Sequence, residues 1–343
     1  MTQHQIKDRL VGLLAIGGVA RVAATLSGPS VVIVMMHRFS GETGGFQGHD
    51  IKTLRRALNE LRTARVSLVG VEAALGAFDQ QGTWASTGSA RPNAFPQFAF
   101  TIDDGYADAV EVAMPVFAEF DCPVTCFVAP HIVEAREWYW WDKVDYLLRN
   151  TSRTQLRLDV NERSMSLPLH SSENRSTAFE TICSIIKSLP TESVPALLQQ
   201  VAFQADTELP RLAPDSYRVL TWNEMRAVES AGWKFGAHTM THPLLGRCSD
   251  EQAEWEITES LASLRRELRR PSEVFCYPVG RDGDFGVREY EILRRNGVEW
   301  ALASTPGRLH DHARLAQDPA WKLRVPRFSF DDRPGGLVRT LLG

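Results

Sequence analysis

The chain has 343 residues, which is enough for one large α/β domain or for two ordinary domains. Apolar residues make up 43% and charged residues 23%, as in a soluble globular protein, and no apolar run reaches the roughly 18 residues of a membrane span. The net charge of -4 and the lack of a basic stripe exclude nucleic acid as a partner on electrostatic grounds.

The first part of the chain has a short apolar stretch at residues 10–20 that follows basic residues and resembles a signal peptide. Asp8 lies within the basic region, however, and Arg21 closes the apolar stretch. We therefore expect a helical segment at residues 1–30, amphipathic and suited to peripheral contact with a membrane surface.

Strand-like apolar runs then alternate with helical patterns, which favours βα units. The predicted strands are residues 31–36, 67–70, 97–102, 124–129, 233–237, 274–277 and 300–304. The predicted helices are residues 51–65, 71–79, 106–120, 221–232, 249–268 and 287–295. Residues 80–96 are rich in Gly, Ser, Thr and Pro and predict a surface loop. Pro115 predicts a kink in its helix, and Thr221 with Glu224 predicts a capping box.

Residues 143–215 interrupt this alternation. The segment contains a predicted hairpin and two helices, at residues 156–169, 177–188 and 192–203. We interpret it as an insertion that roofs the site, within a main domain at residues 31–330 that is followed by a C-terminal tail at residues 331–343.

The chain has five cysteines, and several of them lie in apolar runs. An odd number of buried thiols argues against a disulfide framework and favours a reducing compartment. We therefore predict a cytoplasmic protein.

Two segments offer the residue types of one metal site, and each follows a predicted strand. Asp103 and Asp104 follow one strand, and His238 and His242 follow another. Two imidazoles and one carboxylate form a catalytic zinc set with a position open for water, and the second carboxylate can serve as a base. Because strand ends share one face of a βα barrel, we expect these side chains to lie together. They predict a metal-dependent hydrolase.

These residues resemble the polysaccharide deacetylases, also called carbohydrate esterase family 4 or the NodB homology family. The family's T-F-D-D-G motif is matched by TIDDG at residues 101–105, and its H-[ST]-x-x-H-P motif by HTMTHP at residues 238–243. The resemblance covers residues 31–330 and implies an α/β fold, a distorted (β/α) barrel of about seven strands, with residues 143–215 as a hairpin-plus-helices insertion.

The resemblance implies that Asp104, His238 and His242 hold a divalent metal and that Asp103 is the catalytic base. Zinc is the first expectation, with cobalt, nickel and manganese as alternatives, because availability as well as affinity decides which ion binds. The implied reaction removes N-acetyl groups, with O-acetyl groups left open, from an acetylated carbohydrate in bacterial surface-polysaccharide or glycoconjugate metabolism.

The third family motif, R-P-P-Y-G, departs here, because Cys276 replaces the Arg and Val279 the Tyr. The Val279 backbone N–H can still donate to an oxyanion, since that role does not depend on the side chain. Arg327 is a candidate to replace the missing Arg, with an ordinary surface role as the alternative.

The family's late Leu-x-His, its usual general acid, is absent. His37 follows the strand at residues 31–36 in a Met-His-Arg segment that is similar to the Tyr-His-Arg element of one deacetylase subgroup. His37 is therefore the first candidate for the acid, with His310 and His312 as alternatives.

An aromatic run follows the predicted strand at residues 124–129 and consists of Trp138, Tyr139, Trp140 and Trp141. We expect one or more of these rings to line a groove that leads to the metal, where a ring can stack on a sugar. Packing in the core is the alternative.

Two rival functions stay open. One is another amide hydrolase on the same scaffold, such as a deformylase or an allantoinase-like enzyme. The other is a carbohydrate-binding protein with a vestigial site. The intact set of Asp104, His238 and His242 argues against the vestigial site, while the missing Arg and late His keep it open. The sequence does not indicate the oligomeric state.

Overall fold

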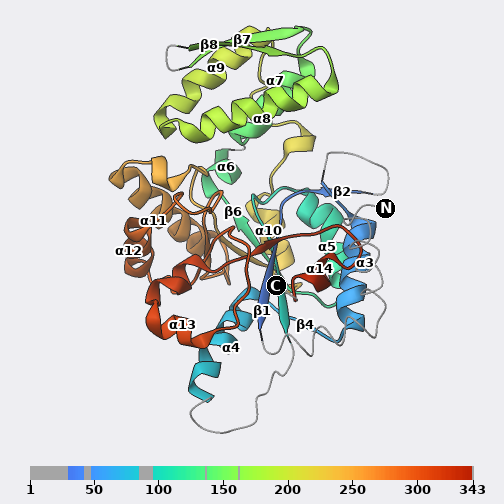
Figure 1. Cartoon of the computed structure of the whole chain (residues 1–343), viewed down its shortest axis with the longest axis vertical. Coiled ribbons are helices and arrows are strands. Elements are labelled where there is room, and N and C mark those ends of the chain that lie inside the picture. The colour runs from blue at the N-terminus through green and yellow to red at the C-terminus, as the bar shows by residue number, and fades with distance from the viewer. Residues whose placement is uncertain (1–29, 42–47, 85–95, 136, 161–162, 342–343) are drawn as a thin grey trace, which may run out of the picture.

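The computed structural model describes residues 30–41, 48–84, 96–135, 137–160 and 163–341. Apart from Ser30, the predicted N-terminal helical segment lies outside the described residues, as does most of the predicted loop at residues 80–96. The described part is an α/β fold with a parallel six-stranded sheet at its centre, and Figure 1 shows this sheet in the lower half of the molecule.

The strands of the sheet run in the order β12-β1-β5-β6-β9, with β4 also paired to β5, and every pairing is parallel. Their bounds are β1 Val31–Met36, β4 Ser67–Leu68, β5 Gln97–Ile102, β6 Val124–Val128, β9 Lys234–Ala237 and β12 Phe328–Ser329. All residues of β5 and β6 are buried, as are five of the six in β1, because helices and loops cover both faces of a parallel sheet. This explains why their sequences are continuous apolar runs without alternation.

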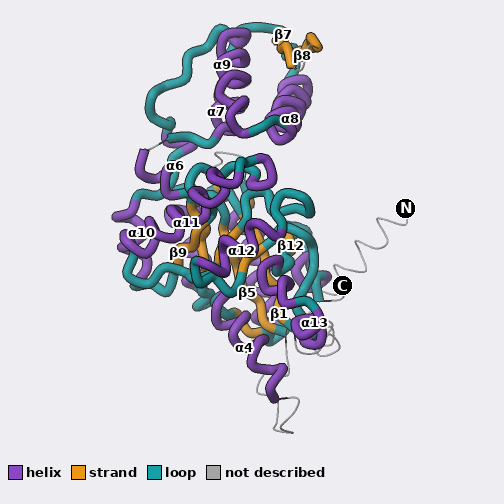
Figure 2. The backbone as a smooth tube through the Cα atoms, turned by 90° about the vertical axis from the view of Figure 1, so that its left-hand side faces the viewer, coloured by secondary structure: helices purple, strands orange, loops and turns teal. Residues whose placement is uncertain are grey.

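Helices surround the sheet, as Figure 2 shows. In this part of the chain they are α3 Ile51–Thr63, α4 Val71–Trp84, α5 Met114–Ala118, α6 Pro130–Ala135, α10 Trp222–Glu229, α11 Asp250–Glu267, α12 Val287–Arg295, α13 His312–Gln317 and α14 Gly336–Arg339. The predicted capping box is present, since Thr221 and Glu224 bond reciprocally at the start of α10. Short helical turns complete the list: η1 Ala109–Ala113, η3 Asp215–Tyr217, η4 Leu245–Arg247 and η5 Pro319–Arg324.

Two helical segments, one after β5 and one at the C-terminal end of the described residues, differ in detail from the prediction. The helix predicted over residues 106–120 is present over residues 109–118, but it is not uniform: the π-helical η1 leads directly into α5, and Pro115 stands in the first turn of α5. The predicted tail at residues 331–343 includes α14, whose Leu337 and Val338 are buried in the main core.

A closed barrel of about seven strands is not confirmed. Strands β10 Phe275–Cys276 and β11 Ala301–Leu302 form a separate parallel pair beyond β9. The chain nevertheless curves round, because Leu302 makes a parallel bridge to Val325, shortly before β12. Two further short strands, β2 Phe39–Ser40 and β3 His49–Asp50, pair beside the end of β1.

The segment after α6 builds a subdomain with a core of its own. Its elements are α7 Trp140–Asn150, β7 Gln155–Val160, β8 Arg163–Pro168, α8 Ser172–Ser188, η2 Thr191–Ser193 and α9 Val194–Ala205. Strands β7 and β8 pair antiparallel, as the predicted hairpin requires. Buried Leu, Ile and Val side chains from α7, β7, α8 and α9 form one cluster, separate from the clusters around the sheet. Figure 1 shows this subdomain above the sheet.

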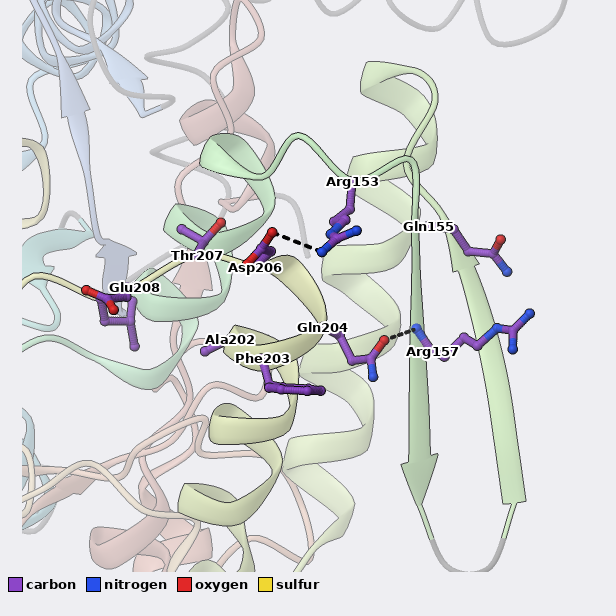
Figure 3. A pocket seen from close by; sticks show the side chains of 10 residues that line it. Arg153, Gln155, Arg157, Ala202, Phe203, Gln204, Asp206, Thr207 and Glu208 are labelled. Atoms are coloured by element: carbon purple, nitrogen blue, oxygen red, sulfur yellow. Dashed lines mark hydrogen bonds and ion pairs between the residues drawn. The ribbon is translucent and has the colours of Figure 1, made fainter.

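Polar contacts join β7 and the residues just before it to the end of α9. Arg153 pairs with Asp206 at 2.9 Å, and the Gln204 side-chain oxygen accepts the backbone N–H of Arg157 at 3.4 Å (Figure 3). A hollow of about 1000 Å³ lies here beside the exposed ring of Phe203.

All five cysteines are free and buried, which agrees with the predicted absence of a disulfide framework. None of the helices in the described ranges has both the length and the apolarity to cross a lipid bilayer.

Candidate active site

The predicted site residues lie at the carboxyl ends of neighbouring parallel strands. His37 follows β1 and Asp103 follows β5, and the Asp103 backbone N–H donates to the Met36 carbonyl at 2.9 Å. His238 follows β9, and its N–H donates to the Val128 carbonyl at the end of β6 at 3.0 Å. Parallel pairing therefore brings residues that are far apart in the sequence to one edge of the sheet.

Asp104, His238 and His242 offer three ligand atoms that lie within 4.8 Å of one another. Asp104 Oδ1 lies 3.7 Å from His238 Nε2 and 3.3 Å from His242 Nε2. Two ligands of one tetrahedral zinc, each bound at about 2.0–2.2 Å, are roughly 3.3–3.6 Å apart. Asp104 Oδ1 and His242 Nδ1 are buried and find no hydrogen-bond partner among the described residues. The spacing and the orphaned carboxylate oxygen both fit a divalent cation.

The ring of His238 is held in the orientation that a ligand needs. Its Nδ1 lies 2.8 Å from the carbonyl oxygen of Cys276, so Nδ1 carries the proton and Nε2 keeps its lone pair toward Asp104. Burial, with a smaller contribution from His242, lowers the pKa of His238 to about 4. The imidazole is therefore neutral near pH 7, as metal ligation requires.

A second group of potential ligands, Asp103, His238 and Cys276, shares one of these imidazoles. Burial raises the pKa of the Cys276 thiol well above its ordinary value, so the sulfur stays protonated and binds a metal poorly. Both carboxylate oxygens of Asp103 are already occupied by Arg327. The group around Asp104 is therefore the better candidate for a metal site.

Arg327 makes a two-pronged ion pair with Asp103. Its guanidinium donates to Asp103 Oδ1 at 2.8 Å and to Oδ2 at 2.9 Å, and the side chain is fully buried. Further hydrogen bonds to Thr101 and to the Ala303 carbonyl fix the guanidinium plane. Burial alone would raise the pKa of Asp103, but the charge of Arg327 outweighs it and holds the pKa below its ordinary value. Of the two roles considered for Arg327, the structure has the buried pairing with Asp103.

Backbone strain is concentrated in this site. Among the described non-glycine residues with positive φ are Asp104 at 71°, Thr239 at 62°, His242 at 61° and Val279 at 59°. Asp and His tolerate this conformation, whereas it is unusual for the β-branched Thr and Val and costs on the order of 1–3 kcal/mol at each residue. Such strain persists only where surrounding contacts fix the backbone.

Glu256 supplies part of that support for the histidine loop, and the sequence analysis missed it. This buried side chain of α11 accepts the backbone N–H groups of Met240 at 2.7 Å and Thr241 at 2.9 Å, and it also bonds the Thr241 hydroxyl. The signal was available, because Glu256 interrupts the apolar face that Ala253 and Ile257 mark at helical spacing.

Gly105 supplies another requirement of the site. It has a φ of 63°, and a Cβ atom there would lie 2.5 Å from Val128 Cγ1. The turn after Asp104 can therefore pass close to β6 only without a side chain.

The aromatic run divides between the core and the cleft. Trp138 and Tyr139 are buried, at 3% and 2% exposure, whereas Trp140 and Trp141 are partly exposed and line the cleft that contains Asp104. Both alternatives considered for the run therefore occur, each for two of the four rings.

Two of these rings hold the metal-ligand candidates in place. The Tyr139 hydroxyl donates to the backbone carbonyl of Asp104 at 2.7 Å. Trp141 stacks on Tyr139 with ring centroids 4.4 Å apart, and its ring lies 4.7 Å from that of His242. The Trp141 indole N–H also donates to the Tyr106 hydroxyl at 2.8 Å. This packing fixes the side of the site toward α7.

A buried carboxyl group extends the network. The Tyr106 hydroxyl donates to Asp142 Oδ2 at 2.7 Å, and the Arg38 guanidinium lies 3.8 Å from the centre of the Tyr106 ring. Burial raises the pKa of Asp142 to about 8. Asp142 is thus largely protonated at neutral pH, despite the nearby Arg38.

The candidates for proton transfer and oxyanion binding are found in different places. His37 is exposed and lines the cleft together with Asp103, Asp104 and Val279. The Val279 N–H makes no hydrogen bond to another described residue and is free to bind an oxyanion. His310 is exposed, is bonded only to the nearby Arg308 carbonyl among described groups, and is not among the cleft residues. The side chain of His312 lies outside the described residues.

Comparisons with known proteins agree with this geometry. The sequence model of the family "Polysaccharide deacetylase" matches residues 90–299, a range that includes both motif segments. The structure is similar to that of Streptococcus pyogenes deacetylase PplD in complex with acetate, with a TM-score of 0.56, 15% identity, and coverage of 91% of this chain and 98% of the other. It is also similar to IcaB from Ammonifex degensii, with a TM-score of 0.54, 14% identity, and coverage of 92% and 97%. At these identities the structural matches establish the fold alone. No curated protein sequence matches the chain.

Proposed function

The chain belongs to the polysaccharide deacetylase family, and from this membership we propose that it is a metal-dependent hydrolase that removes acetyl groups from an N-acetylated carbohydrate. The observation that carries the proposal is the group of Asp104, His238 and His242, whose ligand atoms lie within 4.8 Å of one another. Asp103 stands next to this group as a second carboxylate with a separate partner, Arg327. In this proposal the metal ligands and the base are distinct residues.

Asp104, His238 and His242 would hold the metal. The neutral His238 ring and the orphaned oxygen of Asp104 suit zinc, and cobalt, nickel or manganese are alternatives on the same ligands. When bound, the cation would polarise an acetyl carbonyl and make a water molecule more acidic.

The remaining chemistry belongs to the chain's own side chains. Asp103 accepts a proton from the water whose oxygen attacks the acetyl carbon, and Arg327 keeps this carboxylate ionised and oriented. The Val279 N–H donates to the carbonyl oxygen as negative charge develops there. As the C–N bond breaks, His37 donates a proton to the leaving nitrogen, and the products are acetate and a free amine.

We also propose that residues 143–215 are an insertion into a main domain at residues 31–330. Its independent hydrophobic cluster supports this division. The substrate assignment to surface-polysaccharide or glycoconjugate metabolism, and the cytoplasmic location, stay predictions.

The direct test combines metal analysis with product analysis. The purified protein is expected to bind about one divalent ion per chain and to release acetate from a panel of N-acetylated sugars and oligosaccharides. Formate release from formylated substrates in place of acetate would favour a deformylase. Metal-loaded protein that binds oligosaccharides without releasing either acid would identify a vestigial site.

A further inference from the structure

The cleft that contains the candidate active site extends well beyond it. Its volume is about 990 Å³, and its residues come from both the sheet and the subdomain. Pockets for drug-sized ligands occupy roughly 300–1,000 Å³, so one sugar residue at Asp103 and Asp104 would leave much of the cleft unfilled. The wall opposite the sheet includes α8.

One side of α8 lines the cleft along nearly the whole helix. The residues on it recur at spacings of three and four, and they are Ser172, Arg175, Ser176, Phe179, Glu180, Cys183, Ser184 and Lys187. From Ser172 to Lys187 this side is about 22 Å long at about 1.5 Å per residue. A different side of α8, with Ala178, Ile182 and Ile186, packs into the subdomain core. The exposed residues on the cleft side of α8 are therefore not needed for the packing of the subdomain core.

The cleft side of α8 has the chemistry of a sugar-binding surface. Ser176, Glu180 and Ser184 are exposed, and neither Glu180 nor Lys187 has an ion-pair partner among the described residues. Hydroxyl, carboxylate and ammonium groups can all bond to sugar hydroxyls. Phe179 packs partly against the subdomain core, and the part of its ring that lines the cleft adds an apolar surface of the kind that packs on a sugar. The presence of both signs of charge favours a hydroxyl-rich ligand over a polyanion.

We propose that this side of α8 is a distal glycan-binding wall that determines the preferred length of the substrate. The inference rests on the proposed function and assigns a binding surface for the part of the oligosaccharide beyond the sugar that loses its acetyl group. The sugar that carries the scissile acetyl group lies at Asp103 and His37, and the neighbouring sugars extend toward Glu180, Ser184 and Lys187. The preferred substrate is thus an N-acetylated oligosaccharide of several residues.

The test compares two substrate lengths with matched variants of α8. The substrates are N-acetylglucosamine oligomers of two and six units, in β-1,4- and β-1,6-linked series, and acetate release is measured with zinc-loaded protein. Ser184→Trp places a bulky ring in the cleft, and Glu180→Ala with Lys187→Ala removes the charged contacts. Thr177→Trp adds the same ring to α8 at an exposed position that does not line the cleft.

We expect the six-unit substrate to have a kcat/KM at least about tenfold above that of the two-unit substrate. Ser184→Trp should reduce this ratio about tenfold, mainly through KM for the longer substrate, a loss typical of one or two polar or ring contacts. Thr177→Trp should leave the ratio unchanged, and thermal unfolding should be similar for both Trp variants.

Four results would overturn the inference. Equal kcat/KM for both lengths, or equal effects of Ser184→Trp and Thr177→Trp, would remove α8 from substrate binding while leaving the deacetylase assignment intact. If Phe203→Ala raised KM for the six-unit substrate while Ser184→Trp did not, the distal site would lie at the hollow beside Phe203 instead (Figure 3). No acetate from any oligomer would overturn the proposed function itself, and this inference with it.

Discussion

Replacing Arg327 with Gln should destabilise the protein strongly, because it leaves a buried carboxylate without its partner. The side chains of Arg327 and Asp103 are 0% and 3% exposed, so water cannot take over the lost contacts. Breaking a buried pair by removing one partner costs about 3–5 kcal/mol of unfolding free energy. We expect a loss in this range at neutral pH.

The loss should also depend on pH, with a sign that follows from the pKa of Asp103. In the unchanged protein Arg327 holds this pKa below its ordinary value of 3.8, so the stabilisation is complete above that pH and is lost only as the pH falls further. In Arg327→Gln, burial dominates and raises the pKa above 3.8. The folded variant then binds a proton that the unfolded chain has released, and its stability falls by up to about 1.4 kcal/mol per pH unit up to the raised pKa.

Urea unfolding of the metal-free protein in the presence of a chelator, at pH 5 and pH 8, measures both effects. The deficit of Arg327→Gln should be larger at pH 8 than at pH 5. The control is the double variant Arg327→Gln with Asp103→Asn, which carries no buried charge at this position and should show a smaller deficit that is the same at both pH values. A deficit below about 1 kcal/mol, or one independent of pH in the single variant, would refute the account of this pair.

Three further predictions concern the site. Asp103→Asn should keep its metal but lose most acetate release, because the amide cannot accept the proton of the attacking water. His242→Ala should lose both the metal and the activity, so metal analysis beside an activity assay separates the two variants. Near-normal turnover in Asp103→Asn would exclude Asp103 as the base. His37→Ala should slow turnover with little loss of metal, and an unchanged kcat would remove His37 from the acid role. Asp142→Asn keeps an acceptor for the Tyr106 hydroxyl but cannot ionise. Burial raises the pKa of Asp142 from 3.8 to about 8, so between these pH values Asp142 ionises in the unfolded chain but not in the folded protein, and the unchanged protein loses stability as the pH rises. Relative to the unchanged protein, Asp142→Asn should therefore gain up to about 1.4 kcal/mol of unfolding free energy per pH unit in this range. Parallel curves of stability against pH for the two proteins would contradict this.

The parts of the fold that follow from local sequence were predictable. The capping box at Thr221 and Glu224 depends on residues three positions apart. The hairpin of β7 and β8 depends on alternating residues on either side of one turn. The strands β1 and β5 were recognisable as continuous apolar runs, because both faces of the sheet are covered.

Features that depend on tertiary packing were not predictable in the same way. Whether β10 continues the sheet beyond β9 is decided by the position of a two-residue strand, which no sequence period encodes. The aromatic run at residues 138–141 gave no sign of which rings are buried, because α7 begins within it and changes the direction of successive side chains.

The site residues also divide into those that local sequence identifies and those that depend on tertiary contacts. Asp103, Asp104, His238 and His242 were identified because each pair lies close together in sequence beside an apolar strand. For Arg327 the sequence left two roles open, a partner of the base or an ordinary surface arginine, because its partner Asp103 lies 224 positions away.

That separation has a consequence for how the protein is made. During synthesis Asp103 leaves the ribosome long before Arg327, and parallel pairings between distant segments form slowly because a long loop must first be closed. Until β12 docks beside β1, any folded β5 would contain an uncompensated carboxylate at its end. We therefore expect that Asp103 acquires its final geometry only once β12 has docked, and that a nascent or truncated chain without Arg327 does not keep the sheet closed around this carboxylate. Docking of β12 beside β1 would thus complete this edge of the sheet and assemble the Asp103–Arg327 pair together.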